Sequence, residues 1–158
     1  MKRQRAESHR HCVVCAAPEQ NPASLNVVFK QLQPQQVQAR FTVEAQYQGY
    51  QGVLHGGIAA TLLDAAMTQC LLQQGVEAMT ASMEVRYHQP IAVGSRLTVI
   101  GRQLARKRSL YLMEAEIVTN GQCYASAHGK FMLPAAQDGQ RNTPLAQCAP
   151  EGVSFDAA

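Results

Sequence analysis

A short stretch of the chain, HGGIAATLLDAAM over residues 55–67, holds residue types that can act on a carbonyl group. Gly56 and Gly57 stand where a loop is expected to become a helix, and the first backbone N–H groups of a helix have no partner within it. Those N–H groups and the helix dipole suit a developing negative oxygen, and glycine lets a ligand come close. The alternative is that the glycines only relieve crowding against a strand.

Asp64 stands in the middle of the same apolar stretch, where a carboxylate is costly unless it is paired or used. It lies about two helical turns from Gly56, too far for the two to act on one bond within one helix. An antiparallel helix from a second subunit could place its Asp64 opposite this Gly56, in a site shared across a two-fold interface. The alternative is a structural aspartate hydrogen-bonded to Thr61 or Thr68.

Two further groups of polar residues are candidates for the same chemistry. Thr80 opens the stretch MTASMEVRYHQP, and its hydroxyl could hold a water molecule near the carboxylate, although composition favours an ordinary β-branched strand residue. A basic cluster follows near a strand junction, where arginine and lysine could bind phosphate or simply form a solvated hairpin tip. The cluster consists of Arg102, Arg106, Lys107 and Arg108.

The segment Cys12-Val13-Val14-Cys15 has the spacing of a zinc-ligand pair, with His9 and His11 just before it. A zinc site of the usual kind needs a second pair with comparable spacing, and the remaining candidates are scattered. The sequence therefore predicts no metal site. The scattered candidates are Cys123, His128 and Cys148.

The elements that must position these residues follow from periodicity. Two antiparallel strands are predicted at about 25–32 and 36–45, and apolar residues at helical spacing predict a helix over 56–74, stopped by Gly75. Four strands follow, and Asn120-Gly121 marks a two-residue hairpin turn. One long helix with an antiparallel sheet is an α+β arrangement, with an irregular leader over 1–23, a domain over 24–133 and an irregular tail over 134–158.

Composition limits the kind of protein. The chain has 158 residues, of which 46% are hydrophobic, which suits a single domain with its own core. A formal charge of +3 without a long basic run does not indicate a nucleic-acid binder. We expect no secretory signal and no membrane span. Five scattered cysteines favour reduced thiols and a cytoplasmic location.

The stretches QGVLHGGIAATLLDAAM, MTASMEVRYHQP, GRQLARKRSLYLMEAEI and ASAHGKFML together resemble the acyl-CoA thioesterases of the hotdog superfamily, in particular the phenylacetyl-CoA (PaaI-like) branch. The resemblance covers roughly residues 24–133. It implies a hotdog fold, in which a curved antiparallel sheet of about six strands wraps around one long central helix. It also implies a homodimer or a dimer of dimers that hydrolyses acyl-CoA.

The resemblance implies a role for each catalytic candidate. The Gly56 N–H would polarise the thioester carbonyl, and Asp64 of the partner subunit would act as general base or nucleophile. Thr80 would position the water, and His55 would support the loop. Coenzyme A is part of the substrate, so no cofactor is expected. The substrate would be bound by Gly57, Gln48, Gln51, Arg106, Lys107 and Arg108.

One position departs from the family pattern. Many members carry an asparagine or glutamine in the loop ahead of HGG, and the matching position here is Gly49, flanked by Gln48 and Gln51. Either glutamine could substitute, or the contact is missing. A second reading is therefore an acyl-CoA-binding module with little hydrolysis. A hotdog dehydratase ranks below both, because its chemistry usually needs a histidine paired with an acid on the helix.

Overall fold

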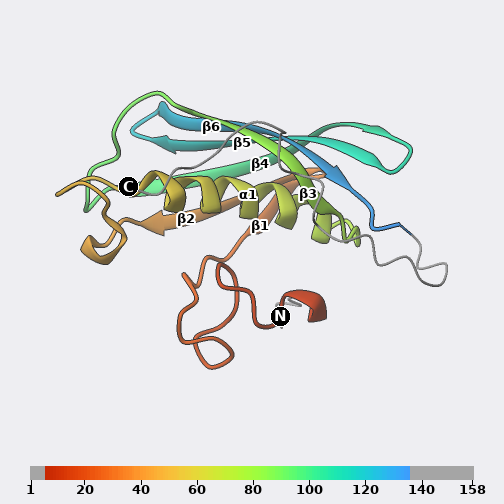
Figure 1. The fold of residues 1–158 in the computed structure, drawn as a ribbon, viewed down its shortest axis with the longest axis horizontal. Helices are drawn as coiled ribbons and strands as arrows, with labels where there is room; N and C mark the ends of the chain where they lie inside the picture. The colour runs from red at the N-terminus through yellow and green to blue at the C-terminus, as the bar shows by residue number, and fades with distance from the viewer. Residues whose placement is uncertain (1–5, 136–158) are drawn as a thin grey trace, which may run out of the picture.

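The computed structural model describes residues 6–135, in which a curved antiparallel sheet packs against one α-helix (Figure 1). The order of elements confirms the prediction of two strands, a helix and four further strands. Two short 3-10 turns, η1 (Glu7–His9) and η2 (Ala45–Tyr47), precede the helix. The main elements are β1 (Lys30–Gln33), β2 (Gln36–Thr42), α1 (Gly56–Leu72), β3 (Met79–Tyr87), β4 (Arg96–Lys107), β5 (Leu110–Thr119) and β6 (Gln122–Met132).

The strands lie in the spatial order β1-β2-β4-β5-β6-β3, and every neighbouring pair is antiparallel. The helix therefore carries the chain from strand β2, near one edge of the sheet, to strand β3 at the other edge. The sheet curves over α1 without closing into a barrel, which leaves β1 and β3 as its two edges (Figure 1). This is the predicted α+β arrangement of six strands around one helix.

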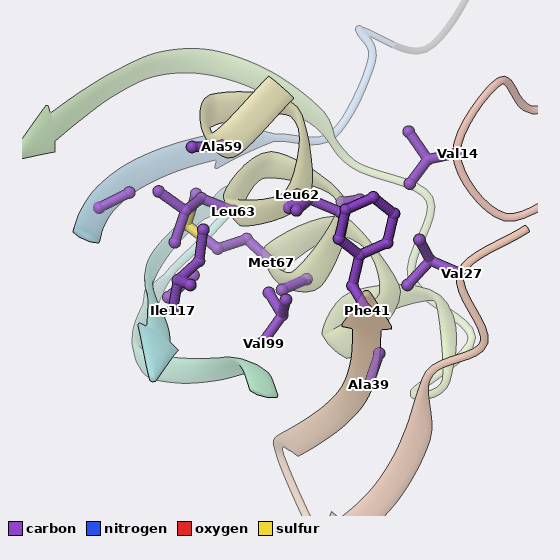
Figure 2. Close-up of a cluster of buried hydrophobic side chains, with 14 of the residues drawn as sticks. Val14, Val27, Ala39, Phe41, Ala59, Leu62, Leu63, Met67, Val99 and Ile117 are labelled. Atoms are coloured by element: carbon purple, nitrogen blue, oxygen red, sulfur yellow. The ribbon is translucent and has the colours of Figure 1, made fainter. Parts of the chain in front are cut away.

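The core forms where the concave face of the sheet meets α1 (Figure 2). Leu62, Leu63 and Met67 of the helix are fully buried against Val99 and Ile117 of the sheet. Because apolar side chains occupy most of the circumference of α1, the helix needs the wide cover that a curved sheet provides.

One glycine allows the helix and the sheet to come this close. A Cβ atom at Gly101 of β4 would clash with the backbone carbonyl of Ala66 in α1. Backbone atoms of a packed helix cannot move aside as the end of a flexible side chain can. Position 101 therefore requires a residue without a side chain.

The predicted strand at 25–32 is wrong in its first half, since strand β1 begins at Lys30. The N–H groups of Leu25 and Val27 donate instead to the leader carbonyls of Val13 and Val14, at 2.9 Å each. Asn26 between them has a φ of 52°, which interrupts an extended conformation.

The leader thereby becomes part of the packed molecule. Val14 and Val27 are buried and lie on the side of the core that Phe41 occupies (Figure 2). Residues 6–29 contain a single short 3-10 turn, yet they contribute side chains to the main hydrophobic cluster.

The predicted ends of the helix and of the hairpin agree closely with the structure. The α1 helix ends at Leu72, and Gly75 just beyond it has a φ of 75°. Asn120 and Gly121 have φ values of 50° and 74°, the left-handed pair that a tight hairpin turn of this type requires. Most of the predicted tail, from residue 136, lies outside the described residues. Within the described range, no helix has the length and apolar character needed to cross a membrane.

Candidate active site

The start of helix α1 presents an open backbone donor. His55 caps the helix, and its Nδ1 accepts a hydrogen bond of 2.8 Å from the Gly57 N–H. The Gly56 N–H has no hydrogen-bond partner within residues 6–135, and both glycines are exposed. The Gly57 N–H can donate to Nδ1 only while that nitrogen carries no proton. The cap thus occupies one N–H and leaves its neighbour for a ligand.

Tyr87, a residue that sequence reasoning did not single out, fixes the position of this donor. Its hydroxyl donates to the Gly56 carbonyl at 2.8 Å, from the end of strand β3. Strand alternation in the sequence puts Tyr87 on the same face as Met83 and Val85. This pattern could have identified Tyr87 as a candidate site residue. The contact holds Gly56 against the sheet.

Two cavities meet this end of the helix at Leu54 and Gly56. One, of about 310 Å³, runs towards Ala59 and the segment from Tyr87 to Ile91 and has a mostly apolar lining. The other, of about 360 Å³, lies beside Gly49, Tyr50 and His55. Gly56 lines both cavities, so a ligand in either one lies against the start of the helix.

Asp64 and Thr80 form the second part of the candidate site. The Thr80 hydroxyl donates to Asp64 Oδ1 at 2.6 Å, and Asp64 is half-buried. The structural alternative named Thr61 or Thr68 as the partner of Asp64. Thr61 donates instead to the Gly57 carbonyl at 2.8 Å, and Thr68 makes no hydrogen bond to Asp64 within the described residues. The carboxylate therefore faces strand β3 and the side where Thr80 is exposed to solvent.

Gly56 and Asp64 of one chain lie apart, as expected from their spacing. Eight residues along an α-helix correspond to a rise of about 12 Å. One chain therefore presents a donor group at one place and a carboxylate with its hydroxyl at another.

The basic residues lie at the Asp64 side of the molecule. Thr80 pairs with Phe131, Phe131 with Tyr111, and Tyr111 with Arg106, in one row across the sheet. Three strand spacings correspond to about 14 Å. The start of strand β4, in contrast, is ten residues or about 33 Å from Arg106 and lies beside the loop that leads to α1.

Side-chain contacts divide the basic cluster. Arg106, Lys107 and Arg108 are exposed, and the Arg106 guanidinium lies 5.2 Å from the centre of the Tyr111 ring. Arg102 is engaged elsewhere, with hydrogen bonds of 2.6 Å to Glu114 and 3.0 Å to Glu116. Partial burial opposes the charged form of Arg102, but these two carboxylates outweigh it and raise the pKa of the guanidinium. Only the hairpin tip is therefore available to an anionic ligand among these four residues.

The loop before the helix explains the glycine at position 49. A Cβ atom there would lie 3.1 Å from Cδ2 and 3.3 Å from Cα of His55, tighter than ordinary packing allows. The neighbouring Gln48 uses its Oε1 to accept a hydrogen bond of 3.0 Å from the Gly52 N–H, inside the loop. Gln51 is exposed. Of the two glutamines, Gln51 is the one whose side chain makes no hydrogen bond within the loop.

Comparison with known proteins points to one family. The family model described as the thioesterase superfamily matches residues 51–124, which include His55, Gly56, Asp64 and Thr80. A solved structure described as a thioesterase superfamily protein superposes with a TM-score of 0.72 and 31% identity, over 78% of this chain and 63% of that one. Residues 51–124 thus match the thioesterase superfamily, and the chain has the hotdog fold.

Two curated relatives are named as acyl-coenzyme A thioesterases. Acyl-coenzyme A thioesterase 13 of Mus musculus is 26% identical over 104 residues, which are 63% of this chain and 74% of the relative. Acyl-coenzyme A thioesterase THEM4 of Bos taurus is 31% identical over 109 residues, which are 67% of this chain and 44% of the relative. The chain thus spans less than half the length of the bovine protein.

Two further solved structures share the fold at lower identity. The E. coli PaaI protein of the phenylacetic acid degradation operon has a TM-score of 0.65 and 22% identity, over 68% of this chain and 83% of that one. A Streptococcus mutans protein bound to acetyl-CoA has a TM-score of 0.65 and 21% identity, over 69% and 89%. Both superpositions show the predicted hotdog fold, which the PaaI protein shares.

Proposed function

We propose that the protein hydrolyses acyl-CoA thioesters in a site shared between two copies of the chain. The observation that carries the proposal is the open Gly56 N–H at the exposed start of α1, combined with a half-buried Asp64 that bonds Thr80. The open Gly56 N–H can bind a thioester oxygen, and the Asp64–Thr80 pair can hold an attacking water. Relatives named as acyl-CoA thioesterases support the choice of substrate.

The reaction follows from these roles. A water molecule, held by Asp64 and Thr80, attacks the carbonyl carbon while Asp64 takes its proton. The Gly56 N–H and the positive end of the helix dipole stabilise the oxyanion of the tetrahedral intermediate. The C–S bond then breaks, the leaving thiolate takes the proton, and the products are the free acid and CoA.

The two-copy arrangement is supported by strand β3. It is nine residues long, forms an edge of the sheet, and exposes backbone groups that a second strand can pair with. Antiparallel pairing of two β3 strands would run the two helices in opposite directions. Gly56 of one chain would then approach Asp64 and Thr80 of the partner.

The same pairing accounts for the basic tip. Arg106, Lys107 and Arg108 lie on the Asp64 side of their own chain, so they would face a substrate whose carbonyl is held by the partner's Gly56. Guanidinium and ammonium groups bind phosphate well, and coenzyme A carries phosphates at the end remote from its thioester. We expect the enzyme to act in the cytoplasm, as a dimer or a dimer of dimers.

The test is thiol release from short, medium, long and aromatic acyl-CoAs, with Asp64→Asn beside the wild type. The expected result is release by the wild type and its loss in Asp64→Asn, with acyl-CoA binding retained. Glu19→Gln is the matched control, because Glu19 is an exposed carboxylate in the leader, outside both β3 and the candidate site. Near-native turnover by Asp64→Asn would make Asp64 structural and contradict the mechanism.

The second candidate is an acyl-CoA-binding module, which Gly49 favours because this position offers no side chain to the carbonyl or the water. Saturable binding in calorimetry without thiol release from any substrate would select it over the hydrolase.

A further inference from the structure

Three side chains in the leader bring metal-binding atoms together. His9 lies at the end of η1, and the atoms offered by His9, Cys12 and Cys15 all lie within 4.8 Å of one another. His9 Nδ1 is 3.6 Å from Cys15 Sγ. The expectation of no metal site rested on the missing second ligand pair. The fold supplies a third ligand from six residues upstream of Cys15 instead.

The separation of these atoms suits a tetrahedral zinc ion. Zinc lies about 2.3 Å from a thiolate sulfur and about 2.0 Å from an imidazole nitrogen. At a tetrahedral angle those bonds put nitrogen and sulfur about 3.5 Å apart. The His9–Cys15 separation matches this edge.

Both sulfur atoms also receive N–H donors, as metal-bound thiolates commonly do. The Val14 N–H donates to Cys12 Sγ at 3.4 Å, and Gln69 Nε2 donates to Cys15 Sγ at 3.2 Å. Donors of this kind orient the sulfur and stabilise its negative charge. Gln69 belongs to α1, so the cluster joins the leader to the central helix.

The surroundings leave room for a fourth ligand. A cavity of about 240 Å³ borders His9, Cys15 and Gln69 and extends to Phe29 and Leu72. Cys15 is buried, whereas His9 and Cys12 are half-buried. An ion can therefore enter from one side and complete its coordination with water.

We propose that His9, Cys12 and Cys15 bind one Zn²⁺ whose fourth ligand is a water molecule from this cavity. Both thiols release their protons to solvent on binding, so that two thiolates balance the charge of the ion. The ion fastens a leader that has a single 3-10 turn of its own, and it offsets the entropy lost when that leader packs on α1.

The test is metal content and Co²⁺ substitution of the full chain. The expected result is one zinc per chain and, with Co²⁺, a thiolate-to-cobalt charge-transfer band with the visible spectrum of a tetrahedral site. Cys12→Ser and Cys15→Ser should lose that band. Cys123→Ser and His11→Ala are matched controls, since Cys123 lies on β6 and His11 Nδ1 lies 3.1 Å from the Gln20 carbonyl.

A variant that keeps all three zinc ligands tests the site with less risk of misfolding. Gln69→Ala should weaken zinc binding about ten- to hundredfold, because it removes a donor to a ligand sulfur. Gln73→Ala, which lines the same cavity, should leave the affinity unchanged. A chelator should lower the melting temperature of the wild type but not that of Cys12→Ser.

Two results would overturn the proposal. One is a chain that binds no stoichiometric zinc and has a Cys12–Cys15 disulfide, seen as a mass lower by two hydrogens. The other is a cobalt spectrum that is the same in the wild type, Cys12→Ser and Cys15→Ser, which would mean adventitious binding elsewhere.

Discussion

At the scale of single residues, the Gly56 N–H can be removed without removing the helix that presents it. Proline is well tolerated at the first helical position, and the preceding residue must then be extended, as His55 already is with a φ of −60° and a ψ of 131°. Gly56→Pro should therefore fold and lower kcat by about 10²- to 10³-fold, the usual loss for one oxyanion donor. Steady-state kinetics on the best acyl-CoA measures this.

Gly56→Ala is the control for that experiment. Its N–H is retained, and its Cβ would meet the Tyr87 ring at 3.5 Å, an ordinary contact. Turnover of the alanine variant should stay well above that of the proline variant. Equal losses in the two would mean that added bulk, and not the missing donor, lowers the activity.

The Thr80 hydroxyl offers a second residue-level prediction. Thr80→Val keeps the shape of the side chain but removes the 2.6 Å hydrogen bond to Asp64. Loss of one such bond should lower kcat about two- to tenfold. Thr80→Ser, which keeps the hydroxyl, should restore most of the rate, and failure of serine to do so would show that the methyl group matters instead.

At the scale of elements, the distance between α1 and the sheet depends on Gly101. A methyl group there clashes with the Ala66 carbonyl, so Gly101→Ala should lower the free energy of unfolding by about 1–3 kcal/mol. Urea denaturation followed by circular dichroism measures the change. Gly56→Ala, with its ordinary contact, should cost much less, and equal stability of the two variants would contradict the packing described here.

The elements also show what the sequence could and could not predict. Helix α1 and the hairpin at Asn120-Gly121 follow local periodicity and turn chemistry, and both were predicted nearly to the residue. The strand prediction was wrong for residues 25–29, because their backbone partners lie in the leader, which has no periodicity of its own. The Asp64–Thr80 contact joins positions 16 apart, and local pattern alone left it one of several alternatives.

At the scale of the whole molecule, a shared site predicts complementation. Asp64→Asn and Gly56→Pro should each have well below a tenth of the wild-type rate, in order of magnitude, as pure proteins. When they are mixed one to one with exchange of subunits, half of the dimers are mixed, and each mixed dimer has one intact site out of two. About a quarter of the wild-type rate should return, as two-fold sharing requires. A site contained within one chain would recover nothing.

The two edges of the sheet differ, and this difference determines how far assembly can go. Strand β1 has four residues and an irregular register with β2, which makes it a poor template for another strand. Strand β3 has nine residues in the outer position. If β3 pairs with the β3 strand of a second chain, both long edges become paired at once. Only the two short β1 edges then remain exposed. Growth by strand addition then stops at two chains, so the same geometry that completes the site also protects the protein against open-ended fibres.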